Sequence, residues 1–225
     1  MKVVILAGGK GTRLSELTGD IPKPMIKIGG KPILQHIMEI YAKHGLNDFI
    51  IAGGYKIGVI DDWLKDAYIP YNVRLVDTGL DTLTGGRVAA LRLGERFALT
   101  YGDGLGNVDI TALLKLHQFH ESYCTLTAVH PPARFGHLEL GLDYVSNFVE
   151  KPLKNEWING GFFIVEPEAV QFVGVDDTWE VALKQMQIRH LLTAYRHTGF
   201  WQCVDTMREV NILEQAAKEG TPWLR

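Results

Sequence analysis

The stretch that decides the fold is Met1-Lys-Val-Val-Ile-Leu-Ala-Gly-Gly-Lys-Gly-Thr-Arg13, which a short spacer separates from Ile21-Pro-Lys-Pro-Met25. The apolar run from Val3 to Ala7 has the length and the β-branched composition of a parallel strand that is buried on both faces. The glycines that follow predict a tight turn whose exposed N–H groups can hold phosphate oxygens. Three side chains of the turn can reach the same oxygens: Lys10, Thr12 and Arg13. The stretch therefore suits an anion with several phosphates.

Two common glycine motifs are absent from this stretch. A Walker A loop needs G-x-x-x-x-G-K-[ST], but here Lys10 precedes the final glycine and no glycine stands at the required distance upstream. A dinucleotide-binding fingerprint needs a third small residue where this chain has Leu14, and Arg13 would crowd the close helix contact. A nicotinamide oxidoreductase is therefore disfavoured. Two interpretations remain, a turn that holds phosphate and a βα turn whose glycines serve only its tight geometry.

Composition limits what this turn can belong to. With 225 residues, 46% of them hydrophobic and 22% charged, the chain is long enough for one well-packed domain over residues 1–225. The formal charge of −3 is spread without a basic block, so neither nucleic acid nor a membrane is an expected partner. No apolar stretch approaches the roughly 20 residues that a membrane span needs, and we expect a cytoplasmic protein. Cys124 and Cys203 lie far apart outside any C-x-x-C pair, which predicts buried, inert thiols.

Strand and helix signals alternate through the first half of the chain. Apolar residues at helical spacing follow Pro32, which suits a first turn, and stop at Gly45. Further strands are predicted at 49–52, 73–76, 97–101 and 124–129, and further helices at 56–67, 86–93 and 109–120. A succession of βα units predicts a Rossmann-like, doubly wound sheet with mainly parallel strands.

The second half has a different pattern. Two short alternating segments, 136–140 and 144–149, predict an antiparallel hairpin laid on the sheet. Strands are expected at 160–165, 191–195 and 200–204, and helices at 178–190 and 206–219. The predicted fold class is α/β, with a doubly wound mixed sheet and a small antiparallel β insertion in the second half.

Lys23 stands between two prolines that stiffen the backbone around it. We expect an extended backbone here, which presents the ammonium group as a point charge for a phosphoryl group at little ordering cost. The alternative is a surface lysine in a proline-rich turn.

Two aspartates follow apolar strands, Asp103 after 97–101 and Asp205 after 200–204. Ligands of open parallel sheets bind beyond the carboxyl ends of the strands, and Mg²⁺ takes one or two carboxylates while keeping several waters. Both aspartates are therefore candidate Mg²⁺ ligands. Asp103 serves equally as a turn former, and Asp205 as the N-cap of the last helix.

Six segments carry a family resemblance: L-A-G-G-K-G-T-R-L at 6–14, P-K-P-M at 22–25, Y-G-D-G at 101–104, F-V-E-K-P at 148–152, N-G-G-F-F at 159–163 and W-Q-C-V-D-T at 201–206. Their order resembles that of the sugar-1-phosphate nucleotidyltransferases, over nearly the whole chain. Within that group, L-V-D-T-G at 75–79, T-G-G-R at 84–87 and A-R-F-G at 133–136 are most similar to the glucose-1-phosphate cytidylyltransferases. Enzymes of this kind join a nucleoside triphosphate, here CTP, to a sugar 1-phosphate and release pyrophosphate.

The resemblance implies a role for each matching residue. Arg13, at the leaving pyrophosphate, and Lys23, at the α-phosphate, would be catalytic. The nucleotide would be bound by Leu6, Ala7, Gly8, Gly9, Gly11 and Thr12, and by Thr84, Gly85, Gly86 and Arg87, the glycines through backbone groups and Arg87 through phosphate. The sugar phosphate would be bound by Tyr101, Gly136, Glu150, Lys151, Asn159 and Gly160. Mg²⁺ would be held by Asp103 and Asp205.

The chemistry is consistent with these roles. Attack by a phosphate oxygen on the α-phosphorus brings two anions together, so positioning and charge neutralisation supply most of the acceleration. No covalent nucleophile or general base is needed, and no serine or cysteine stands beside a histidine in the sequence. The pair His117 and His120 is expected at the surface, and Phe162 and Phe163 in the core.

One connection departs from the resembled enzymes. The segment 68–72 is shorter than theirs, in a region associated with subunit contacts, so a homo-oligomer is an open expectation. Two alternatives to the cytidylyltransferase remain open as well. One is a uridylyl- or thymidylyltransferase acting on a different sugar phosphate, and the other is a nonenzymatic protein that binds nucleotide sugars on the same scaffold.

Overall fold

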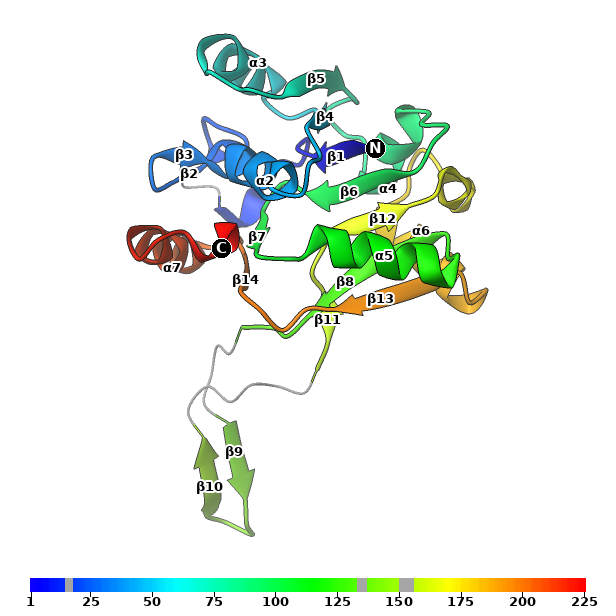
Figure 1. The fold of residues 1–225 in the computed structure, drawn as a ribbon. Helices are drawn as coiled ribbons and strands as arrows, with labels where there is room; N and C mark the ends of the chain where they lie inside the picture. Colours follow the sequence, from blue (N-terminus) through cyan, green and yellow to red (C-terminus); the bar gives the residue numbers. More distant parts are fainter. Residues whose placement is uncertain (15–17, 133–136, 150–155) are drawn as a thin grey trace.

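The computed structural model describes residues 1–14, 18–132, 137–149 and 156–225. An eight-stranded sheet runs through the centre of this described part (Figure 1). Along the sheet the strands follow the order β11-β8-β12-β6-β1-β4-β5, and β13 pairs with β8 outside this path. Their bounds are β1 (Lys2–Leu6), β4 (Asp48–Gly53), β5 (Asn72–Asp77), β6 (Phe97–Tyr101), β8 (Cys124–Val129), β11 (Ile158–Asn159), β12 (Phe163–Val165) and β13 (Leu192–Arg196).

The sheet is mixed and mainly parallel, as the sequence predicts. Strand β1 pairs in parallel with β4 on one side and with β6 on the other, and β5 extends the parallel part beyond β4. Strand β12 runs antiparallel between β6 and β8. The strand at 124–129 therefore does not lie beside β6, because the later strand β12 separates them.

Helices cover both faces of the sheet because the strands are apolar on both sides. Val3 and Ile5 of β1 pack in one buried cluster and Val4 and Leu6 in the other. The first cluster includes residues of α2 (Ile33–Ala42), α3 (Ile57–Asp66), α5 (Ile110–His120) and α7 (Met207–Lys218), and the second includes residues of α4 (Thr84–Ala90) and α6 (Trp179–Ile188). Each fully buried aliphatic side chain contributes about 1.5–3 kcal/mol. The doubly wound prediction is confirmed.

Two predicted boundaries are wrong. The helix expected at 86–93 is α4, which begins at Thr84 and ends at Ala90. The strand expected at 160–165 begins only at Phe163, because Gly161 and Phe162 have φ angles of 75° and 49° in the left-handed region. The ring of Phe162 lies in the core, where it is fully buried as expected.

The predicted hairpin is present as β9 (His137–Leu140) and β10 (Val145–Val149), which pair antiparallel. It forms a sheet of its own and extends away from the main sheet in Figure 1. All five side chains of β10 are exposed. The expectation that the hairpin lies on the sheet is therefore wrong.

A second small sheet positions the site. Strand β7 (Gly104–Gly106) continues from β6 after a turn and pairs antiparallel with β14 (Trp201–Cys203). Among the described residues, the remaining short elements are β2 (Lys27–Ile28), β3 (Lys31–Pro32) and four 3-10 helices, η1 (Thr12–Leu14), η2 (Lys23–Met25), η3 (Pro167–Phe172) and η4 (Pro222–Leu224). Of the helices described, none combines the length and the apolar character that a membrane span requires.

His117 is buried, and the prediction that it lies at the surface is wrong; His120 is exposed as expected. The Nδ1 of His117 lies 2.8 Å from the Thr125 hydroxyl, and the Nε2 of His117 lies 3.1 Å from the Glu166 carboxylate. These partners satisfy the ring where α5 packs on the sheet, which a spacing of histidines along one helix does not reveal. Thr125 is itself fully buried, so this hydroxyl, imidazole and carboxylate series has no access to a substrate.

Both cysteines are free thiols, as expected. Burial raises the pKa of Cys124, and burial together with the nearby Asp205 and Asp103 carboxylates raises the pKa of Cys203 to about 11. Neither thiol is therefore poised to react as a thiolate.

Candidate active site

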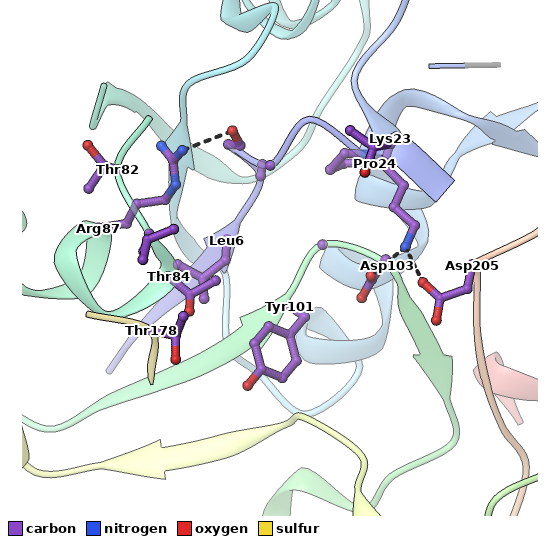
Figure 2. A pocket seen from close by; sticks show the side chains of 17 residues that line it. Leu6, Lys23, Pro24, Thr82, Thr84, Arg87, Tyr101, Asp103, Thr178 and Asp205 are labelled. Atoms are coloured by element: carbon purple, nitrogen blue, oxygen red, sulfur yellow. Dashed lines mark hydrogen bonds and ion pairs between the residues drawn. The ribbon is translucent and has the colours of Figure 1, made fainter. Parts of the chain in front are cut away.

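A pocket of about 390 Å³ opens at the carboxyl ends of β1 and β6. Its wall includes most of the opening glycine loop, the side chains of Lys23 and Asp103, and Asp205 from the last fifth of the chain. Figure 2 shows Arg87 at one end of this pocket, Tyr101 on its floor and Lys23 at the other end. Residues from several of the separate motifs thus line one cavity, at the edge where parallel sheets bind their ligands.

The glycine loop forms one side of the pocket through Leu6, Ala7, Gly8, Gly9, Gly11 and Thr12. A Cβ on Gly8 would lie 2.2 Å from the Arg87 guanidinium, so a side chain there would displace that group. Gly11 has a φ of 62°, which favours glycine, and its carbonyl accepts a hydrogen bond from Leu14 N at 2.9 Å. The side chain of Arg13 lies outside the described residues, and the role predicted for it stays a prediction.

Lys23 begins the 3-10 helix η2. Pro22 is extended before it, but Met25 N donates to Pro22 O at 2.8 Å and Ile26 N to Lys23 O at 3.1 Å. The expectation of an extended backbone at Lys23 is therefore wrong, since the prolines favour a φ that a 3-10 turn also accepts. The Cα of Lys23 is held firmly in either case.

The ammonium group of Lys23 lies between two carboxylates. Its Nζ donates to Asp103 Oδ2 at 2.8 Å and to Asp205 Oδ1 at 2.8 Å, as the dashed lines in Figure 2 mark. Burial alone would lower the pKa of Lys23, but the charges and hydrogen bonds of Asp103 and Asp205 outweigh it and raise the pKa above its ordinary value. Lys23 therefore carries its full positive charge at neutral pH.

The pairing of β7 with β14 brings the two aspartates together. Cys203 lies opposite Gly104 in that pair, and Val204 N donates to Asp103 O at 2.9 Å. Thr206 is the N-cap of α7 and forms a capping box with Glu209. Asp205 thus does not have the helix-capping role that the sequence left open.

The two carboxylates suit a magnesium ion that keeps several waters, rather than a metal enclosed entirely by protein ligands. Both reach one cation, the Lys23 ammonium, so a metal at that place would have two carboxylate ligands. Within the described ranges no group of three or more His, Cys, Asp or Glu side chains could hold a metal. Mg²⁺ characteristically binds one or two carboxylates and completes its shell with waters and substrate phosphates.

Arg87 is buried at the opposite end of the pocket, where its guanidinium serves backbone carbonyls. Its Nη1 donates to Gly53 O at 2.9 Å and to Gly79 O at 2.8 Å, and its Nη2 donates to Gly8 O at 2.9 Å. Burial lowers the pKa of Arg87. The guanidinium thereby ties the glycine loop to the ends of β4 and β5. The phosphate contact predicted for Arg87 stays a prediction.

Gly85 and Gly86 are not among the residues that line the pocket. Their N–H groups both donate to Asp177 O, at 3.0 and 3.1 Å, and a Cβ on either would meet the 173–177 segment at about 2 Å. The two N–H groups are therefore already paired within the protein, and α4 needs both glycines to approach that segment. The contact with the base that is predicted for the backbone groups of these glycines stays a prediction. Thr84 does line the pocket, and its hydroxyl accepts a hydrogen bond from Trp179 N at 2.9 Å.

Tyr101 and Asn159, both predicted to bind the sugar phosphate, lie together. The Tyr101 hydroxyl donates to Glu180 Oε1 at 2.6 Å and lies 3.4 Å from Asn159 Nδ2. Gly160 is buried beside them, where its carbonyl accepts from Trp201 Nε1 at 2.9 Å. Gly136, Glu150 and Lys151 lie outside the described residues.

Several residues of the site escaped the sequence reasoning. Thr82 and Leu83 precede the T-G-G-R segment directly and could have been included with it. Thr178 and Glu180 reach the site from the start of α6, and no motif around them signals this position.

The fold and the pocket together define an α/β protein with a glycine-lined pocket at the carboxyl edge of its sheet. The model of the nucleotidyl transferase family matches residues 2–203. The chain belongs to this family and is an enzyme of it.

Two relatives match almost their whole length. The chain is 42% identical to a glucose-1-phosphate cytidylyltransferase of Salmonella typhimurium over 253 positions, which cover 99% of this chain and 98% of the relative. It is 39% identical to a probable glucose-1-phosphate cytidylyltransferase of Bacillus subtilis over 241 positions, with 95% and 94% covered. Each alignment is longer than the 225 residues of this chain, so both relatives contain residues that it lacks.

Solved structures share the fold. HddC from Yersinia pseudotuberculosis is 25% identical, with a TM-score of 0.75 over 96% of this chain and 99% of its own. A UDP-glucose pyrophosphorylase in complex with UDP-glucose is 19% identical, with a TM-score of 0.75 over 97% and 98%. The second likeness concerns the fold alone.

Proposed function

We propose that the enzyme transfers the cytidylyl group of CTP to glucose 1-phosphate, with Mg²⁺, giving CDP-glucose and pyrophosphate. The observation that carries the proposal is the meeting of Lys23, Asp103 and Asp205 at one end of the pocket that the glycine loop borders. The names of the two relatives that match almost the full chain support cytosine and glucose as base and sugar.

The triphosphate lies along the glycine loop in this proposal. Gly8, Gly9, Gly11 and Thr12 line the pocket. Backbone N–H groups and a threonine hydroxyl suit phosphate oxygens. Arg13 is assigned to the leaving pyrophosphate. Arg87 holds Gly8 in place through its carbonyl and so keeps this loop in shape.

The reaction is a direct displacement at the α-phosphorus. An oxygen of glucose 1-phosphate forms the new bond to phosphorus while the bond from the α-phosphorus to the bridging oxygen breaks, and the electron pair leaves with the pyrophosphate. The attacking phosphate is already ionised, so no residue has to remove a proton. Lys23 contributes charge at the α-phosphate, where the two anions meet.

Asp103 and Asp205 would hold the Mg²⁺ ion. When bound, the ion supplies positive charge that neutralises the phosphates during the displacement. The carboxylates contribute position, because Asp103 is fixed in the turn between β6 and β7 and Asp205 between β14 and α7.

The sugar and the base are assigned to different residues. We assign the sugar to Tyr101, Asn159 and Gly160, with Gly136, Glu150 and Lys151 as further predicted contacts. Glu180 positions the Tyr101 hydroxyl through its hydrogen bond of 2.6 Å. The base is assigned to Thr84 with its neighbours Thr82 and Leu83, which line the same pocket.

A substrate matrix tests the function. Purified full-length chain with Mg²⁺ is assayed with CTP, UTP, dTTP, GTP and ATP against the 1-phosphates of glucose, galactose, mannose and N-acetylglucosamine, and pyrophosphate release is measured. The expected optimum is CTP with glucose 1-phosphate. An optimum at UTP or dTTP would replace the base assignment, and release from no pair would overturn the proposal.

A further inference from the structure

The place between Asp103 and Asp205 already has a cation in this structure. The Lys23 ammonium bonds to one oxygen of each carboxylate at 2.8 Å, which is the length expected of a charge-assisted hydrogen bond. The Lys23 side chain is 14% exposed and the two carboxylates are 32% and 26% exposed. The ion triad is therefore largely shielded from water, and its electrostatic interactions are stronger than those of a surface pair.

An ammonium group and a divalent metal compete for these oxygens. A metal ion between the carboxylates would stand within a few ångströms of the present Nζ position, where two cations repel each other strongly. Mg²⁺ also binds its oxygens at about 2.0–2.1 Å, a much shorter distance than the ammonium group uses. Both cations cannot share this arrangement, so the metal can enter only if the ammonium group moves.

The structure lets the ammonium group move while its backbone stays in place. The 3-10 helix η2 and the flanking prolines fix the Cα, and the remaining freedom is that of a four-carbon stem beside an open pocket. An α-phosphate in that pocket would offer the ammonium group a new anionic partner.

We propose that Lys23 is the resident counter-ion of the Asp103 and Asp205 pair, and that a divalent metal enters this site together with the nucleotide rather than before it. This inference rests on the proposed function for the nucleotide and the metal. The triphosphate brings oxygens that complete the metal's shell and draws Lys23 away, so binding of the two is cooperative. Without nucleotide, the lysine offsets part of the negative charge of the two carboxylates and occupies the place that a free metal ion would take.

A titration with Mn²⁺ alone tests the inference. Free Mn²⁺ is measured by electron paramagnetic resonance as it is added to the full chain without nucleotide. Lys23→Met should bind Mn²⁺ about tenfold more tightly than the unaltered chain, since the competing cation is gone; tenfold corresponds to about 1.4 kcal/mol. With α,β-methylene-CTP present, the unaltered chain should gain affinity for Mn²⁺ by at least about the same factor.

Lys65 supplies a matched control. Its Nζ also lies between two aspartates, at 2.7 Å from Asp61 and 3.4 Å from Asp62, on the exposed side of α3. Lys65→Met changes the net charge equally, so its Mn²⁺ affinity at the active site should equal that of the unaltered chain. Equal affinities in Lys23→Met and Lys65→Met would overturn the inference.

A second measurement keeps the test open should Lys23→Met fold poorly. The nuclear magnetic resonance signal of the ¹⁵N-labelled Lys23 ammonium group is assigned by its loss in Lys23→Arg. In the unaltered chain this signal should keep its chemical shift when Mg²⁺ alone is added, and should change it when the CTP analogue is added with Mg²⁺. A shift with Mg²⁺ alone contradicts the inference. Substrate turnover enters neither measurement, so an inactive chain can still satisfy the inference and an active one can still fail it.

Discussion

Two lysines of this chain each lie between two aspartates, and they differ in almost everything else. Lys65 meets Asp61 and Asp62 one helical turn away on α3, whereas Lys23 meets partners 80 and 182 residues distant. The pKa of both lysines is raised, in Lys65 by its neighbours on the helix and in Lys23 against the opposing effect of burial. The same three charged groups therefore interact with different strength in the two places, because solvent screens the ion triad of Lys65 and tertiary structure shields that of Lys23.

The largest expected difference is in catalysis. Lys23→Met should lower kcat by about a hundredfold to a thousandfold, the usual effect of losing one preorganised group at the reacting centre. Lys65→Met should leave kcat unchanged. Steady-state pyrophosphate release with CTP and glucose 1-phosphate measures both. If Lys23→Met keeps kcat within about threefold of the unaltered enzyme, the role of Lys23 at the α-phosphate is wrong.

The aspartates extend the comparison to the metal. Asp205→Asn should lower kcat/KM by about a hundredfold and raise the Mg²⁺ concentration for half-maximal rate, because one of two carboxylate ligands is neutralised. Asp61→Asn removes a charge of the exposed triad and should change neither quantity. A magnesium titration of both variants at saturating substrates decides the matter, and an unchanged Mg²⁺ requirement in Asp205→Asn would exclude it as a ligand.

Arg87 is a buried cation whose partners are carbonyl groups rather than carboxylates, so its replacement tests a different role of a buried charge. Arg87→Lys should reduce the free energy of unfolding by about 2–3 kcal/mol, because several buried carbonyls lose their donors. We also expect a higher KM for CTP, since the Gly8 carbonyl loses the hydrogen bond that holds the glycine loop. Urea unfolding and nucleotide kinetics measure the two effects. A stable variant with normal kinetics would show that Arg87 does not brace this loop.

The smallest expected effect concerns stability and pH. The folded-state pKa of Lys23 lies above its ordinary value of 10.5, so its stabilising contribution is complete below that pH and is lost as pH rises through the folded-state pKa. Lys23→Met should therefore lower the free energy of unfolding by about 1–2 kcal/mol near neutral pH, and the difference should shrink in strongly alkaline solution. Lys65→Met should show no measurable change, because its partners are solvent-exposed. Parallel urea titrations at neutral and alkaline pH test this, and a pH-independent difference would contradict it.

The sequence by itself determined the fold class and the place of the glycine turn that borders the pocket. Val3 to Leu6 is apolar at every position, which only a strand covered on both faces accommodates, and the glycines after it had to form the turn at its carboxyl end. These are local properties that composition and order express directly. Lys23 and Asp103 could be predicted as site residues for the same reason, because each lies beside a strand or turn that the sequence itself predicts.

Only the tertiary structure decided which distant residues meet. The pairing of β7 with β14 brings Asp205 to Asp103, and no short-range pattern encodes that register. The burial of His117, the packing of Gly85 and Gly86 against 173–177, and the arrival of Glu180 at Tyr101 have the same origin. In each case a contact between elements far apart in the chain decides the outcome. Such contacts depend on how the whole core packs rather than on the neighbouring residues in the sequence.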